Sequence, residues 1–168
     1  MKQNIILIGM PGVGKSTIGV ILAKLLGYQF IDADLVIQEK EGRLLHEIIA
    51  SEGTDGFLEI ENRINCGISP QKAVIATGGS VAYEKEAMEH YKEIGTVVYL
   101  QVSYSILEKR LSDIKGRGVV LRDGQDLKAL YEERTPLYEK WADLVVAEED
   151  LGVEETVELL RQELKVQK

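Results

Sequence analysis

Cysteine is nearly absent from this chain of 168 residues, because Cys66 is the only one. A disulfide or a cysteine metal site needs more than one thiol, so neither forms within the chain, and we expect Cys66 to fill space on a helix. No apolar run approaches the roughly 20 residues that a membrane-spanning helix needs. The first residues also lack the basic and apolar regions of a signal peptide. We therefore expect a cytoplasmic protein with no membrane partner.

Basic residues are in the minority. Lys and Arg together number 20 against 28 Asp and Glu, which gives a formal net charge of −8. Nucleic-acid binding depends on neutralising phosphates with Lys and Arg, so this balance argues against a nucleic-acid partner. The same net charge repels a small anionic ligand at long range, and such a ligand therefore needs a local cluster of cationic side chains.

Repeats, low-complexity tracts and long linkers are also absent, which favours one domain over residues 1–168. The chain instead alternates short apolar runs with helical patterns, which is typical of a parallel sheet covered by helices on both faces. The sequence thus predicts a three-layer α/β fold. Expected strands are 4–8, 29–32, 73–77, 96–101 and 144–146. Expected helices lie near 16–26, 34–40, 45–51, 56–66, 86–93, 103–112, 127–134 and 154–165.

The strongest motif follows the first predicted strand. Residues 9–16 read Gly-Met-Pro-Gly-Val-Gly-Lys-Ser, which matches the phosphate-binding pattern G-x-x-x-x-G-K-[ST], and a helical pattern comes next. The glycines let main-chain N–H groups converge on phosphate oxygens where that helix begins. We expect Lys15 to bridge the β- and γ-phosphates and the Ser16 hydroxyl to bind Mg²⁺. The predicted nucleoside triphosphate site comprises Gly12, Val13, Gly14, Lys15, Ser16 and Thr17.

The second predicted strand ends in two carboxylates, Asp32 and Asp34. Alternation aims both the same way if the chain stays extended, which places them beside the phosphate-binding loop. One carboxylate is suited to hold Mg²⁺ through water or to accept the proton of an attacking hydroxyl. The other is suited to bind substrate hydroxyls. An N-cap role for Asp34, for a helix from Leu35 onward, is the alternative and is compatible with function.

Paired glycines follow the third predicted strand, in the sequence Thr77-Gly78-Gly79-Ser80. They indicate close approach of the backbone to a ligand. A plain strand-to-helix turn explains them almost as well, so this pattern alone leaves both interpretations open.

Arginines gather between residues 109 and 138. Arg110 ends a predicted helix, Arg117 and Arg122 lie in a loop that contains three glycines, and Arg134 follows. Such a loop is able to close over a bound nucleotide and exclude water, and its arginines would neutralise phosphoryl charge. The alternative is a solvated surface loop with ordinary ion pairs.

Other titratable residues carry weaker signals. His46 and His90 stand singly on predicted helices without a second ligand at metal spacing, so we expect surface or packing roles for both. The acidic run that begins at Glu148 is expected to form a solvated face.

The phosphate-binding loop, the Phe30-x-Asp32-x-Asp34 strand end, the glycine turn and the arginine-bearing loop occur in one order and at close spacing. As a set they resemble the shikimate kinase family of nucleoside-monophosphate-kinase-like proteins, over residues 2 to about 160. The resemblance implies a five-stranded parallel sheet in the order 2-3-1-4-5. It also implies a mobile lid over about 112–126 and an acceptor-binding region over about 33–62.

The resemblance also assigns roles residue by residue. It makes Asp32 the metal-side and catalytic aspartate, beside Lys15, and Arg117 the lid arginine that reaches phosphate. Arg110 would lie against adenine, so that Arg110 and Arg117 join the ATP-binding set. The substrate-binding residues that it implies are Asp34, which binds hydroxyls, Gly78 and Gly79, which donate main-chain N–H groups, and Arg134, which grips a carboxylate.

The chain departs from the family pattern at three places. Leu58 stands where a second carboxylate-binding arginine belongs, and the lost charge-assisted bond is worth about 1.5–3 kcal/mol. Glu61, also on the substrate side, would then be left as an unpaired negative charge. Ser80 replaces a third glycine and is expected to add a hydroxyl to the pocket wall. Residues 117–121 lack the proline that stiffens the family lid.

These departures spare the ATP side and fall on the acceptor side. We expect a monomeric kinase that depends on Mg²⁺ and ATP and phosphorylates a small metabolite, with shikimate converted to shikimate 3-phosphate as the default. A different hydroxylated acceptor is the alternative, motivated by Leu58. A regulatory module that binds ATP without transferring phosphate is a second alternative.

Overall fold

The computed structural model describes residues 2–112, 126–148 and 151–165. Most of the predicted lid, with Arg117 and Arg122, lies outside these residues. The strands are β1 (Asn4–Ile8), β2 (Gln29–Asp32), β3 (Ala73–Ala76), β4 (Gly95–Gln101) and β5 (Leu144–Ala147). The helices are α1 (Lys15–Leu26), α2 (Ala33–Glu41), α3 (Leu45–Cys66), the short 3₁₀ helix η1 (Val81–Tyr83), α4 (Lys85–Ile94), α5 (Tyr104–Ser112), α6 (Leu127–Trp141) and α7 (Val153–Glu163).

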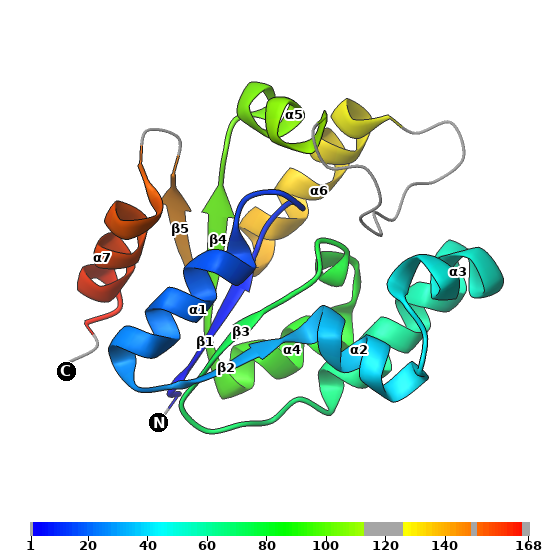
Figure 1. The fold of residues 1–168 in the computed structure, drawn as a ribbon, viewed down its shortest axis with the longest axis horizontal. Helices are drawn as coiled ribbons and strands as arrows, with labels where there is room; N and C mark the ends of the chain where they lie inside the picture. The colour runs from blue at the N-terminus through cyan, green and yellow to red at the C-terminus, as the bar shows by residue number, and fades with distance from the viewer. Residues whose placement is uncertain (1, 113–125, 149–150, 166–168) are drawn as a thin grey trace.

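The five strands form one parallel sheet in the order β2-β3-β1-β4-β5. Helices α1 and α7 pack together over one face, and α4 and α6 lie on the other (Figure 1). The three-layer α/β fold and the strand order implied by the resemblance are therefore confirmed.

Strand β1, in the middle of the sheet, is covered on both of its faces. All five of its residues are buried, as expected for a continuous apolar strand in the middle of a parallel sheet. A second, smaller hydrophobic cluster holds α2 against α3, and its buried members are Ile37, Ile48, Phe57 and Ile64. The region predicted to bind the acceptor therefore has a small core of its own.

One helix differs in extent from the prediction, and one predicted break between helices is confirmed. The helices expected at 45–51 and 56–66 are the two parts of α3, which meet in a kink at Gly53, whose φ of 73° is not helical. The helix expected to end at residue 134 continues through Pro136 to Trp141. Tertiary contacts explain this continuation, because Tyr138 is fully buried and the Trp141 indole donates to the Ala82 carbonyl at 3.1 Å.

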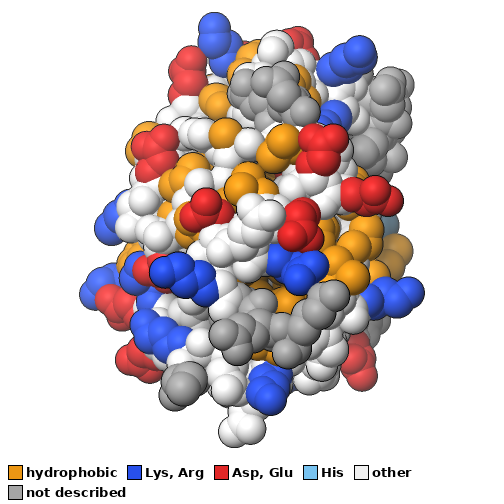
Figure 2. Space-filling model, turned by 90° about the vertical axis from the view of Figure 1, so that its left-hand side faces the viewer, with side chains coloured by type: hydrophobic (Ala, Val, Ile, Leu, Met, Phe, Trp, Pro, Cys, Tyr) orange, Lys and Arg blue, Asp and Glu red, His pale blue; other side chains and the backbone are white. Residues whose placement is uncertain are grey.

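Charged side chains of both signs are mixed on the surface of the protein. On the face in Figure 2, side chains of both signs are interspersed with hydrophobic ones. Among the residues that the structure describes, no helix is both long enough and apolar enough to span a membrane.

Candidate active site

The phosphate-binding loop connects β1 to α1 at the carboxyl edge of the sheet. Gly12 and Gly14 have φ values of 87° and 92°, which L side chains rarely adopt. Gly14 is also the N-cap of α1, so the first N–H groups of that helix, which have no partner within it, face the loop. The motif therefore folds into the geometry in which helix N-termini bind anions.

Lys15 is the cationic side chain of this loop, and only 8% of it is exposed. Its ammonium group donates to the carbonyl of Gly9 at 2.7 Å and to that of Met10 at 3.0 Å. These bonds fold the long side chain back over the loop and fix its charge beside the cleft. The arrangement provides a local positive charge of the kind that a chain of net charge −8 needs for an anionic ligand.

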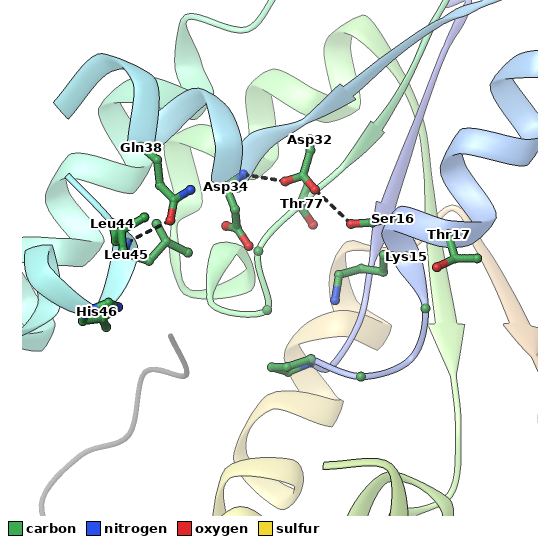
Figure 3. Close-up of a pocket in the computed structure, with 15 residues that line it drawn as sticks. Lys15, Ser16, Thr17, Asp32, Asp34, Gln38, Leu44, Leu45, His46 and Thr77 are labelled. Atoms are coloured by element: carbon green, nitrogen blue, oxygen red, sulfur yellow. Dashed lines mark hydrogen bonds between the residues drawn. The ribbon is translucent and has the colours of Figure 1, made fainter. Parts of the chain in front are cut away.

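Asp32 connects the loop to the next helix. Its Oδ2 accepts a hydrogen bond from the Ser16 hydroxyl at 3.0 Å, while Oδ1 accepts from the backbone N–H groups of Asp34 and Leu35 (Figure 3). Asp32 is thus the N-cap of α2, so the alternative role considered for Asp34 is wrong. The chain leaves the extended conformation after Asp32, because the helix begins at Ala33.

A cleft of about 460 Å³ lies beyond the carboxyl ends of β1, β2 and β3. Nine of the predicted site residues line it, namely Gly12, Gly14, Lys15, Ser16, Thr17, Asp32, Asp34, Gly78 and Gly79. The register explains this convergence, because Asp32 pairs with Ala76, and Ala76 pairs with Leu7, just before the loop. The phosphate-binding loop and the two aspartates therefore share one cleft (Figure 3).

The wall around Gly78 is backed by Glu61, which is fully buried. Glu61 Oε1 accepts a hydrogen bond from the Ser80 hydroxyl at 2.5 Å. The Ser80 hydroxyl is a neutral donor, so Glu61 gains a hydrogen bond from it but no opposite charge. The expected hydroxyl on the pocket wall is wrong, because the Ser80 hydroxyl points to Glu61 and Ser80 does not line the cleft.

Arg134 and Leu58 also lie behind the cleft wall. Arg134 is 1% exposed, and its guanidinium stacks over the Tyr83 ring, 5.3 Å from the ring centroid. A Cβ on Gly79 would lie 2.9 Å from Arg134 Nη1, so the guanidinium sits directly against this glycine. Leu58 is half-buried and packs on the cluster between α2 and α3. Neither residue lines the cleft.

A second hollow, of about 220 Å³, lies on the other side of the phosphate-binding loop and includes Val13 and Arg110. Arg110 donates to the carbonyl of Gly12 at 3.3 Å and to Glu148 Oε1 at 3.1 Å. Glu148 is only 3% exposed, so its expected place on a solvated face is wrong. Burial raises the pKa of Glu148, while the Arg110 guanidinium opposes this shift. The hollow thus joins the loop to an ion pair between a buried carboxylate and a partly exposed arginine.

A family model described as "SKI: Shikimate kinase" matches residues 11–165. The chain belongs to the shikimate kinase family. The shikimate kinase of Thermodesulfovibrio yellowstonii is 37% identical over 164 residues, which are 96% of this chain and 94% of that protein. That of Trichormus variabilis is 39% identical over 158 residues, 92% of this chain and 84% of that protein.

Solved shikimate kinases also share the fold. The structure from Acinetobacter baumannii in complex with shikimate has a TM-score of 0.86 at 32% identity and covers 97% of this chain and 93% of its own. The structure from Aquifex aeolicus has a TM-score of 0.82 at 32% identity, with 96% of both chains covered. As a member of the shikimate kinase family, the chain is an ATP-dependent kinase that phosphorylates a hydroxyl group.

The shikimate kinase cleft contains residues that the sequence analysis did not assign to a site. They are Pro11, Gln38, Leu44, Leu45, His46 and Thr77. Gln38 Oε1 accepts from the Leu45 N–H at 3.0 Å (Figure 3) and thereby joins α2 to the start of α3. Pro11 lies within the phosphate-binding motif itself. The sequence signal for Gln38 on α2, and for the residues at the start of α3, was weak because their positions depend on the packing of α2 against α3.

Gly78 offers a direct test of the expectation that this side of the cleft binds the acceptor. A Cβ there would lie 2.7 Å from both Asp34 Oδ1 and Glu61 Oε2, so Gly78→Ala must displace both carboxylates. Because Asp34 is expected to bind the acceptor, its displacement should weaken acceptor binding, and we expect the acceptor KM to rise roughly 10- to 100-fold. The ATP KM should stay unchanged, because Lys15 lies on the other side of the cleft. Gly67→Ala is the matched control, since its φ is −89° and its nearest new contact is 3.4 Å away. An unchanged acceptor KM in Gly78→Ala would contradict this position for the acceptor.

Proposed function

We propose that this kinase transfers the γ-phosphate of ATP to a hydroxyl group of shikimate. The observation that carries the proposal is the single cleft that joins Lys15 and Ser16 on the loop side to Asp34 and Gly78 on the α2 side. A nucleotide phosphate and an acceptor hydroxyl bound in this cleft would lie next to each other, as transfer requires. The related Acinetobacter baumannii enzyme, solved with shikimate, supports this acceptor.

On the nucleotide side, the N–H groups of the loop would bind the phosphates and Lys15 would bridge the β- and γ-phosphates. Arg110 and Val13 line the hollow next to the loop, where we place the adenine. The role proposed for Arg117, stabilisation of the transferred phosphoryl group, rests on the sequence alone, because Arg117 lies outside the described residues.

Ser16 and Asp32 fit a site for Mg²⁺. The Ser16 hydroxyl and the Asp32 carboxylate lie 3.0 Å apart, and both are oxygen donors of the kind that Mg²⁺ prefers. Mg²⁺ often binds through few protein ligands and completes its shell with water and phosphate. When bound, Mg²⁺ would neutralise phosphate charge.

In the proposed reaction, the acceptor oxygen forms a bond to the γ-phosphorus while the bond from that phosphorus to the bridging oxygen of ADP breaks. Asp34 would orient the acceptor by accepting hydrogen bonds from its hydroxyls. Asp32 would accept or orient the proton of the attacking hydroxyl. Lys15 would offset the charge that develops on the phosphate oxygens.

The shikimate carboxylate needs a cationic partner at the acceptor site. Arg134 lies directly against Gly79, and we propose that it attracts the carboxylate through this part of the wall. Because Leu58 provides no second cation, a different hydroxylated metabolite is the second candidate. The steady-state rate of ADP formation with shikimate, measured against a panel of hydroxylated metabolites, tests the proposal. A preferred panel member with higher kcat/KM would replace shikimate.

Leu58→Arg separates the two candidates. Leu58 packs on the cluster between α2 and α3 and not in the cleft, so an arginine there must leave that cluster to reach a carboxylate. We expect kcat/KM for shikimate to change less than about tenfold, below the full value of a charge-assisted bond. Leu58→Met controls for lost packing without adding charge. Poor use of shikimate by the unaltered enzyme together with a large gain in Leu58→Arg would favour the second candidate.

We further propose that the enzyme acts as a monomer in the cytoplasm. A single cysteine suits the reducing cytoplasm. The monomer is supported by the cleft, whose lining residues on the loop side and on the α2 side belong to one chain. Sedimentation equilibrium of the purified chain, with and without ATP, measures the oligomeric state. A concentration-dependent dimer would contradict the monomer.

A further inference from the structure

Two buried carboxyl groups meet behind the acceptor wall. Glu61 on α3 is fully buried and Glu84, the N-cap residue of α4, is 5% exposed. The two side chains lie within hydrogen-bonding reach of each other. Glu61 Oε2 and both side-chain oxygens of Glu84 have no donor among the described residues. Ionised carboxylate oxygens only accept hydrogen bonds, so these two groups can hydrogen-bond to each other only if one of them carries a proton.

Among the described residues, the side chains that interact with this pair carry no positive charge that would replace the proton. Around the pair stand Asp34 from α2, Asn65 and Cys66 from α3, Ser80 from the turn, and Tyr91 from α4. None of these side chains is a cation. From α6, Arg134 and Glu133 contact Tyr83 on η1.

Burial makes two negative charges at this place costly. A buried carboxylate without a partner is disfavoured, and two adjacent carboxylates disfavour each other further. Burial first, and then the hydrogen bond and charge of Glu61, raise the pKa of Glu84 well above its usual range. The neutral state of one member is therefore favoured at neutral pH.

The pair is connected to the acceptor wall through the turn between β3 and η1. The Ser80 hydroxyl donates to Glu61 at 2.5 Å. The backbone of Val81 bonds to Gly78 O, and the N–H of Glu84 bonds to Val81 O. On the cleft side of this turn, Asp34 and Glu61 approach Gly78 from two directions. A second negative charge behind Gly78 would repel both of these carboxylates.

We propose that Glu61 and Glu84 share one proton, and that this proton holds the turn at Gly78, Gly79 and Ser80 against α3. Glu84 is then a positioning residue for the acceptor, although it does not line the cleft. The positioning role rests on the proposed function, because it assumes that the acceptor binds at this wall. The shared proton itself does not depend on that assumption.

Infrared spectroscopy tests the shared proton without any substrate. We expect the unaltered enzyme at neutral pH to show the carbonyl band of a buried protonated carboxyl group. Glu84→Gln should lose this band, because an amide replaces the protonated group. Glu93→Gln is the matched control on the same helix, since Glu93 is exposed, and it should keep the band. Absence of the band in the unaltered enzyme would overturn the shared proton.

The acceptor KM of two Glu84 variants tests the positioning role. The raised pKa of Glu84 keeps the shared proton bound at the pH of the assay. We therefore expect Glu84→Gln to keep an acceptor KM near that of the unaltered enzyme, because its amide donates to Glu61 in place of the proton. Glu84→Ala should raise the acceptor KM several-fold and leave the ATP KM unchanged. An acceptor KM in Glu84→Ala equal to that of the unaltered enzyme, or an equal rise in Glu84→Gln, would overturn the positioning role. Failure to use shikimate would instead overturn the proposed acceptor and leave the infrared result standing.

Discussion

Lys15→Met is expected to lower kcat by on the order of 10³-fold while the protein stays folded. Lys15 brings its ammonium group to the cleft within 3.0 Å of two carbonyls of the phosphate-binding loop. Methionine fills a similar volume without charge, so the packing beneath the loop is kept. The proposed bridge to the β- and γ-phosphates would be lost, and with it the charge that would offset the transition state. Turnover at saturating ATP and acceptor is the measurement.

The control for this variant is Lys24→Met. Lys24 lies on the same helix and is exposed, so the same chemical change there should leave turnover and the melting temperature unchanged. A melting temperature of Lys15→Met close to that of the unaltered enzyme would show that the fall in turnover is not caused by unfolding. Turnover near the unaltered level in Lys15→Met would contradict the assignment of this loop as the nucleotide site.

The elements that the sequence predicted well are those whose pattern is local. Strand β1 is a continuous apolar run, and its bounds match the prediction. The phosphate-binding loop is specific because glycines, a lysine and a serine are required at fixed spacing. The carboxyl ends of parallel strands lie at one edge of a sheet, so the position of Asp32 next to Ser16 followed from the same local patterns.

The features that the sequence did not predict depend on contacts between distant elements. Glu148 is buried because Arg110, 38 residues earlier, pairs with it. Glu61 meets Ser80 and Glu84 only because α3 packs against η1 and α4. Charge patterns along the chain favour solvent exposure for such carboxylates, and only the tertiary structure reverses this expectation. The same holds for Pro136, which local rules place outside a helix.

Asp32→Asn is expected to separate the two roles of Asp32. Asp32 Oδ1 caps α2 by accepting from two backbone N–H groups, whereas Oδ2 faces Ser16. Asparagine caps helices about as well as aspartate, so we expect the unfolding free energy in urea to change by less than about 0.5 kcal/mol. Turnover should fall roughly 10²- to 10⁴-fold, because the negative charge that we propose to hold Mg²⁺ and receive the proton is gone.

Asp32→Ala is the matched comparison, because alanine removes both the cap and the charge. We expect it to lose similar activity and, in addition, about 1 kcal/mol of stability. Turnover of Asp32→Asn should also need a higher Mg²⁺ concentration than that of the unaltered enzyme, which a titration with Mg²⁺ at saturating ATP measures. If Asp32→Asn keeps its activity while Asp32→Ala loses it, Asp32 acts by capping α2, and the proton then passes to another group in the cleft, of which Asp34 is the nearest carboxylate along the chain.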